Sequence, residues 1–220
     1  PHRLRGAIEG RFRVILAPDH CYDLAIAAHG VVLQFELAKA QSIHGSGQPD
    51  WQKVRDVAEG VLRHHSKDLR VAVWLTWALH QCESFPGLLA GLGLLRDLCE
   101  RHWGEVYPAK PRTRAAAFGW LVLRLEPLCL QNLALHPQRP LFQAILEHLT
   151  QLDELWSGYL GEDAPLLLPV RRQLAEHLER AGQAAPEPGA VGAVIAQLKH
   201  ATTQLLAPEP AIDSEKAAHK

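Results

Sequence analysis

An all-α fold is predicted by three features of the sequence. Apolar residues recur at three- and four-residue spacing along most of the chain, the pattern of helices with one buried face. No region is rich in strand signals, and no internal repeat or low-complexity tract stands out. The apolar content of 47% over 220 residues is sufficient to bury a sizeable core. We predict a bundle of seven to eight helices, packed as one unit or as two helical subdomains.

The first helices are expected to follow a loosely attached arm formed by residues 1–20. One helix is predicted over 23–41, ending before the glycines of 45–47. Its expected buried stripe is Leu24, Ala28, Val31 or Val32, Phe35 and Ala38. The next is predicted to begin at the N-cap Asp50, with charged residues on its exposed face. Its expected buried residues are Trp51, Val54, Val57 or Ala58, Val61 and Leu62.

The third predicted helix is expected at the centre of the fold. We expect Ser66 to cap it, because a serine directly before an apolar run accepts the first free backbone N–H groups. Its apolar residues lie nearly all round the helix, so neighbours are expected on several sides. These residues are Leu69, Val71, Ala72, Val73, Trp74, Leu75, Ala78 and Leu79.

Phe85-Pro86-Gly87 is expected to break the chain before a fourth helix that ends at Gly104. Gly87 and Gly91, one turn apart, are expected to let a neighbouring helix approach closely. After a rigid connector at Tyr107-Pro108, the remaining helices are predicted over 113–130, 141–156, 166–181 and 189–206. We divide the chain into an arm (1–20), a first helical domain (21–132), a helical extension (137–206) and a linker or tail (207–220).

Charge and cysteine content exclude several classes of protein. A formal net charge of -1, with no cluster of basic residues, offers no footprint for nucleic acid. No run reaches the roughly 18 to 20 uncharged apolar residues of a membrane span. Cys21, Cys82, Cys99 and Cys129 are widely spaced, which favours a reduced cytoplasmic protein over one with disulfides. No secretory signal opens the sequence, and the absence of Met indicates a processed start or an excised fragment.

Motifs that would carry catalysis or ligand binding are weak. Ser66 beside Lys67 invites comparison with an activated nucleophile, but adjacent residues at a helix start point in different directions, so capping is favoured. The 13 histidines lack metal-ligand spacing. The glycines after residue 86 lack the Lys-Ser/Thr pair of a phosphate-binding loop. We therefore expect no catalytic residue, no cofactor and no metal site.

The tryptophans lie on or near apolar stripes, and most are expected in the core. Trp74 and Trp77 lie on the third predicted helix, which is apolar nearly all round. They are therefore the candidates for an exposed aromatic surface that binds a partner.

A series of residues from Asp50 to Leu125 matches a known pattern: Ser66-Lys67-Asp68-Leu69-Arg70, Gly87-Leu88, Gly91-Leu92, Trp103, Tyr107-Pro108, Arg114 and Trp120-Leu121. This series resembles the ImpA N-terminal family, whose known members are the TssA proteins of bacterial type VI secretion systems. Residues 141–178 are similar to the helical extension of longer members. The segment from Ala17 to Leu24 lacks the glycine that the family usually has there. No ring-forming C-terminal domain follows Leu206, so a fragment or a short variant is expected.

The resemblance implies a non-enzymatic cytoplasmic assembly component that engages baseplate, tube and sheath proteins as the secretion tail is built. Self-association is a further expectation. The resemblance leaves two roles open for four charged residues, Lys67, Asp68, Arg70 and Arg114. They could form caps and ion pairs that orient the helices, which we favour, or they could contact a partner directly. The positions that carry the family pattern are Ser66, Lys67, Asp68, Arg70, Trp103, Tyr107, Pro108, Arg114 and Trp120.

Two alternatives remain open. One is a hydrolase or ligand-binding helical protein whose site lies between the N-terminal helices and the helices of 141–206. It requires polar groups that converge in a pocket, and an ordered pocket near His64, His65 and Glu105 would favour it. The other is a helical adaptor unrelated to secretion, which would bind proteins outside the secretion machinery.

Overall fold

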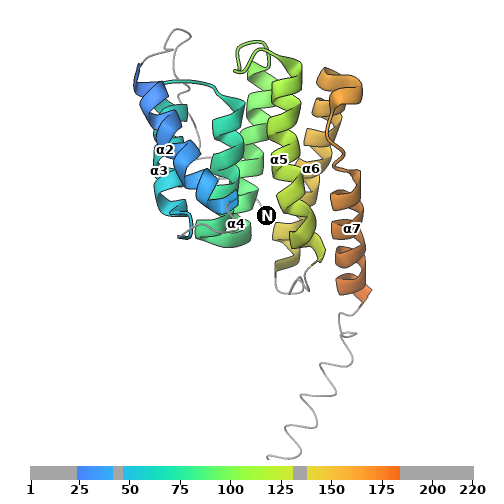
Figure 1. Cartoon of the computed structure of the whole chain (residues 1–220). Helices are drawn as coiled ribbons and strands as arrows, with labels where there is room; N and C mark the ends of the chain where they lie inside the picture. The colour runs from blue at the N-terminus through green and yellow to red at the C-terminus, as the bar shows by residue number, and fades with distance from the viewer. Residues whose placement is uncertain (1–23, 42–46, 131–137, 184–220) are drawn as a thin grey trace, which may run out of the picture. The chain divides into compact units, whose positions relative to one another are not determined.

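The computed structural model describes residues 24–41, 47–130 and 138–183. Within these ranges it contains six α-helices, one 3₁₀ turn and no strand, which confirms the all-α prediction (Figure 1). The elements are α2 (Leu24–Gln41), α3 (Trp51–His64), α4 (Leu69–His102), α5 (Pro111–Leu130), α6 (Arg139–Leu160), η2 (Gly161–Asp163) and α7 (Leu168–Gln183).

The predicted count of seven to eight helices is slightly above the six that the described residues contain. The third and fourth predicted helices are the two parts of α4, which meet at Ser84. The helix predicted at 189–206 lies outside the described residues, as do the arm at 1–20 and the tail at 207–220.

Helix α4 is a hairpin of two helical limbs, 69–83 and 85–102. Ser84, with φ 59° and ψ -144°, is the one residue inside it with non-helical dihedrals, and it reverses the chain direction. Figure 1 shows α4 turning back on itself. The predicted break at Phe85-Pro86-Gly87 therefore corresponds to a real turn, which begins one residue earlier.

The two limbs of α4 approach closely at the two glycines that the sequence singled out. A Cβ on Gly87 would lie 2.2 Å from the carbonyl oxygen of Leu79. A Cβ on Gly91 would lie 2.6 Å from the Cα of Thr76. Real Cβ atoms do not come this near to backbone, so only glycine permits the observed spacing. The prediction of close helix packing at these glycines is confirmed.

The hairpin of α4 lies at the centre of the fold, as predicted for its first limb. Helix α3 packs on it on one side, and α5 and α6 also pack against it. Leu69, Leu75, Leu92 and Leu95 are almost fully buried, and each such side chain contributes about 1.5–3 kcal/mol. The core continues into α5 and α6, where the rings of Phe118 and Trp156 stack with centroids 4.1 Å apart. The predicted domain boundary near residues 132–137 remains a prediction.

Helix α2 buries a different face from the one predicted. Leu33 and Leu37 are buried, whereas Val31 and Phe35 of the predicted stripe are 66% and 62% exposed. The helix is apolar on nearly all sides, so spacing alone does not select its buried face. The carboxylate of Glu36 contributes to that selection, because this side chain is buried and bonded to groups beside the start of α3.

Glu36 makes three contacts, one within α2 and two that link α2 to the start of α3. Its carboxylate accepts a hydrogen bond from Lys39 Nζ at 2.8 Å and one from the backbone N–H of Asp50 at 3.2 Å. Lys53 Nζ lies 3.5 Å away. These contacts, led by the hydrogen bond from Lys39, lower the pKa of Glu36. Asp50 in turn caps α3 as predicted, since its side chain accepts from Lys53 N–H at 3.0 Å.

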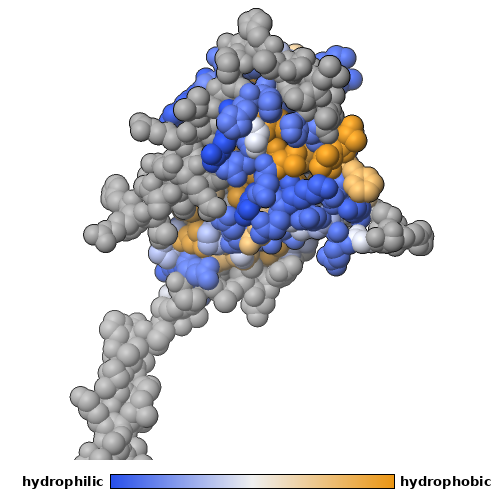
Figure 2. Space-filling model, turned by 90° about the vertical axis from the view of Figure 1, so that its left-hand side faces the viewer, coloured by the Kyte–Doolittle hydropathy of each residue, from blue (hydrophilic) through white to orange (hydrophobic). Residues whose placement is uncertain are grey.

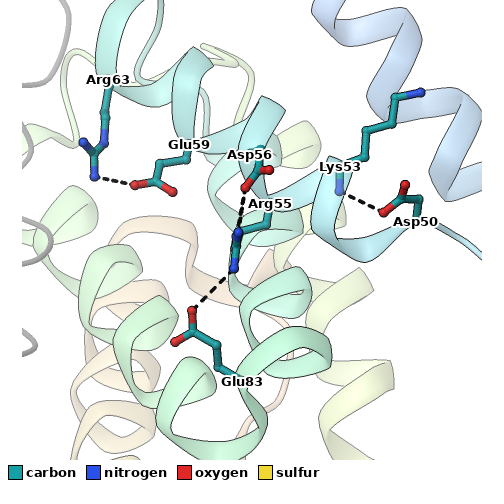
Figure 3. Close-up of polar contacts among 7 residues, drawn as sticks. All are labelled: Asp50, Lys53, Arg55, Asp56, Glu59, Arg63 and Glu83. Carbon is teal, nitrogen blue, oxygen red and sulfur yellow. Dashed lines mark hydrogen bonds and ion pairs between the residues drawn. The ribbon is translucent and has the colours of Figure 1, made fainter.

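The charged face of α3 is paired within itself and with α4 (Figure 3). Arg55 bonds Asp56 at 2.9 Å and lies 3.7 Å from Glu83 at the end of the first limb of α4. Arg63 pairs with Glu59 one turn away. Figure 2 shows the side that carries α2 and α3, where hydrophilic residues surround a smaller hydrophobic patch. Exposed pairs of this kind contribute about 0–1 kcal/mol each.

Two further properties concern the described part of the chain. None of its helices is long and apolar enough to cross a membrane.

Cys82, Cys99 and Cys129 form no disulfide, and burial raises the pKa of Cys99 to about 12 and that of Cys129 to about 11. Cys21 lies outside the described residues.

Candidate functional site

Most of the residues that carry the family pattern come together at one junction. The loop between α3 and α4 pairs with the connector between α4 and α5 through a short parallel bridge of Asp68 and Tyr107. Tyr107 N–H donates to the carbonyl oxygen of Lys67 at 2.9 Å, and Leu69 N–H donates to that of Tyr107 at 2.8 Å. We call residues 103–110 the connector. The bridge ties it to the first residues of α4.

Asp68, not Ser66, is the N-cap of α4. Its carboxylate accepts from the backbone N–H of Arg70 at 2.8 Å and pairs with the Arg70 guanidinium at 2.6 Å. Ser66 is buried, and its N–H closes the end of α3 by donating to Val61 O at 2.9 Å. The prediction of a Ser66 cap is therefore wrong. Asp68, in the bridge to the connector, is extended, with φ -91° and ψ 116°, so the helix begins two residues later than the sequence suggests.

Lys67 forms an ion pair that spans the junction. Its ammonium lies 2.6 Å from the carboxylate of Glu105 in the connector. His102 Nδ1 lies 3.3 Å from the same carboxylate oxygen. The hydrogen bond from Lys67, followed by the one from His102, lowers the pKa of Glu105. Because Glu105 is exposed, this pairing orients the connector more than it stabilises the fold.

Arg114 holds the connector from the opposite side. It begins the second turn of α5, is only 7% exposed, and donates to three carbonyl oxygens of the connector. Nε bonds Pro108 O at 2.6 Å, Nη1 bonds Trp103 O at 3.0 Å, and Nη2 bonds Val106 O at 2.6 Å. Burial lowers the pKa of this guanidinium. The acceptors are all neutral carbonyl oxygens, so none of these contacts is an ion pair, whereas the bond to Trp103 O reaches the C-cap residue of α4.

Trp103 completes the support under the connector. The Arg114 guanidinium carbon lies 4.4 Å from the centroid of its ring, within the range of a cation–π contact. The ring also stacks on Tyr159 of α6, with centroids 4.3 Å apart and planes 12° apart. Trp103 thus connects the end of α4, the start of α5 and the end of α6.

The outer surface of the junction carries side chains of the kinds found in protein interfaces. Tyr107 is 37% exposed, and the side chain of Arg70 is 40% exposed. Pro108 is half-buried, whereas Lys110 and Arg112 are exposed at the start of α5. Tyr and Arg are enriched among residues that dominate binding energy. The junction is therefore a candidate interaction surface on a rigid base.

Trp120, Trp74 and Trp77 lie elsewhere. Trp120 is half-buried on α5, and the guanidinium carbon of Arg124 lies 3.4 Å from the centroid of its ring. Trp74 and Trp77 are both half-buried and pack against the core from the first limb of α4. Their predicted role in partner binding remains a prediction.

Side chains that bind metal ions do not gather in the described residues. No group of three or more His, Cys, Asp or Glu side chains is placed to hold a metal ion in this part of the chain. His64 and His65 lie beside each other at the end of α3, with ring centroids 6.3 Å apart. A small cavity lies among α4, α5, α6 and α7, and its lining, which includes Phe85, Leu125 and Phe142, is apolar.

Comparisons with known proteins agree with the pattern read from the sequence. Residues 20–123, just under half of the chain, match the family described as "ImpA, N-terminal, type VI secretion system". No curated protein matches the chain. The structure is similar to the N-terminal domain, including the conserved ImpA_N region, of the TssA component of the type VI secretion system from Burkholderia cenocepacia.

The similarity to the Burkholderia domain has a TM-score of 0.58 and a sequence identity of 20%. It covers 83% of this chain and 93% of that domain. At this identity the likeness concerns the fold. The family resemblance predicted from the residues between Asp50 and Leu125 is confirmed.

Proposed function

From the match of residues 20–123 to the ImpA N-terminal family, we propose that this protein is a TssA-like assembly component of a type VI secretion system. It acts in the cytoplasm by binding other proteins of the machinery, and it catalyses no reaction. Its partners are baseplate, tube or sheath proteins met while the secretion tail is built.

The family match is the observation that carries this proposal. The fold supports it, because the likeness to a TssA N-terminal domain extends beyond the matched segment to 83% of the chain. The geometry supports a binding role, since most of the family-pattern residues meet at one junction, where buried Asp68 and Arg114 hold the backbone and Tyr107 and Arg70 are exposed.

Affinity capture tests the proposal. The whole chain is used as bait in an extract of cells with an active type VI secretion system, and captured proteins are identified by mass spectrometry. Enrichment of baseplate, tube or sheath proteins over a control extract that lacks the system's other components is the expected result. Capture of unrelated proteins alone, by bait shown to be folded by circular dichroism, would instead favour an adaptor outside secretion.

A further inference from the structure

We propose that Arg114 is a positioning residue that holds the connector so that Tyr107 and a basic rim meet a protein partner with an aromatic-binding pocket flanked by carboxylates. This inference rests on the proposed function and concerns the same surface. Arg114 is buried, so it acts through the connector and does not touch the partner.

The contacts of Arg114 fit this role because they are distributed over the whole connector. Its three carbonyl acceptors belong to residues 103, 106 and 108, which lie on both sides of Tyr107. Carbonyl oxygens that converge on one point cannot bond one another, and a planar guanidinium supplies several donors in a fixed fork. A lysine ammonium at the same position is a single point charge on a flexible stem. It does not reproduce the fork over a stacked Trp103 ring.

The backbone of Tyr107 is fixed on its other side by the bridge to α4. The N–H of Tyr107 donates to Lys67 O, and its carbonyl oxygen accepts from the N–H of Leu69. The start of α4 therefore holds Tyr107 itself, while Arg114 holds the carbonyl oxygens of the flanking residues 106 and 108. The Tyr107 side chain is exposed at this doubly fixed point. An aromatic side chain on fixed backbone loses little conformational entropy on binding, which is a property of interface anchors.

The charges around Tyr107 identify the chemistry of the partner. Lys67 is paired with Glu105, and Arg70 is paired with Asp68. Exposed Lys110 and Arg112 follow directly along the chain and add two positive charges beside the connector. A partner surface that offers carboxylates around a pocket for the tyrosine ring complements this arrangement.

The same helix provides a matched control. Arg124 also lies over a tryptophan ring, that of Trp120, and donates to one carbonyl oxygen, Trp120 O, at 3.0 Å. It shares the chemistry of Arg114, and it makes its carbonyl bond within α5, not to the connector. Arg124→Lys therefore reports the general cost of replacing a stacked arginine in α5.

The test compares the wild-type chain with Arg114→Lys, Tyr107→Ala and Arg124→Lys in two measurements. The first is amide hydrogen exchange at Tyr107 and Leu69, with amides of α6 as the internal reference. The second is quantitative capture of baseplate, tube and sheath proteins from the extract described above. Arg114→Lys is expected to speed exchange at the two junction amides about tenfold or more, as expected for weakened bonds from a charged donor. It should leave the α6 amides much less affected and reduce capture.

Tyr107→Ala separates positioning from contact. It keeps the backbone bonds, so exchange at Leu69 should be unchanged, but capture should fall at least tenfold, as expected for an anchor residue. Charge reversal by Lys110→Glu should also weaken capture. Arg124→Lys should behave like the wild-type chain in both measurements.

Several results would overturn the inference. If amide exchange at the junction is unchanged in Arg114→Lys, Arg114 does not position the connector. If a folded Tyr107→Ala variant captures partners as well as the wild type does, Tyr107 is not the side chain that binds them. Equal effects at the junction and in α6 would mean that Arg114 stabilises the whole fold without positioning this surface. If Arg114→Lys does not fold, Tyr107→Ala and Lys110→Glu still decide the partner surface. If the wild-type chain captures no secretion protein, the proposed function and the partner surface both fail. Amide exchange at the junction still decides whether Arg114 positions the connector.

Discussion

The close approach of the two α4 limbs predicts that Gly91→Ala destabilises the protein strongly. The added Cβ would lie 2.6 Å from the Cα of Thr76 and 2.8 Å from its Cβ. Because the nearest atom belongs to the backbone, no side-chain rotation relieves the contact. The limbs must instead separate by about 1 Å to reach ordinary van der Waals distance, and the buried leucines on both limbs lose contacts.

The size of the effect follows from two opposing terms. Overpacking a well-packed core costs about 1–3 kcal/mol and more where backbone must move. Replacing glycine by alanine inside a helix returns about 1 kcal/mol through helix propensity. For a backbone clash at the upper end of the first range, the net loss in the free energy of unfolding is about 2 kcal/mol.

Gly60→Ala is the matched control for Gly91→Ala. Gly60 lies inside α3, and nothing lies within 4 Å of an added Cβ. The same substitution should therefore stabilise the protein there by up to about 1 kcal/mol. Urea unfolding followed by circular dichroism measures both variants, with equal m-values required for comparison. A Gly91→Ala variant as stable as the wild type, or more stable, would refute the close packing of the limbs.

Three further predictions concern other parts of the fold. Ser84→Gly should stabilise the protein by about 1 kcal/mol in thermal unfolding, because φ 59° with ψ -144° is strained for serine and open to glycine, and Ser84→Ala, which keeps the strain, should not. Glu36 has a lowered pKa in the folded state, so its carboxylate stabilises the fold at pH values above the unfolded pKa near 4.3 and loses this contribution as pH falls through the folded pKa. The difference in the free energy of unfolding between wild type and Glu36→Gln should therefore shrink below about pH 4. A difference that stays constant with pH would contradict the assignment. Asp68→Ala should cost about 1–2 kcal/mol in urea unfolding through loss of the cap and of the Arg70 pair, whereas Asp68→Asn should keep most of the cap, so equal losses would argue against capping.

The turn within α4 and the register of α3 were accessible from the sequence. Pro86 and its glycine neighbour break helical continuity, and two glycines one turn apart leave room for only a backbone neighbour. In α3 the apolar residues occupy one face, so Val54, Ala58 and Val61 could only point to the core. These features depend on residues close together in the chain.

Features that depend on distant residues could not be predicted in the same way. Helix α2 is apolar on most sides, and its buried face is linked to the contact of Glu36 with the start of α3. The cap of α4 shifts from Ser66 to Asp68 because the connector, about 40 residues later, pairs with the loop. The pattern identified Arg114 as a family position, but its three acceptors become neighbours only when the connector folds.

The central claim, that this protein is a working part of a type VI secretion system, is tested most directly by deleting its gene in the source organism. The amount of the system's tube protein released into the medium is then measured, with the gene restored in a control strain. The account predicts that release is lost on deletion and recovered on restoration. Release at the wild-type level after deletion, with no second gene of the same family present, would contradict it.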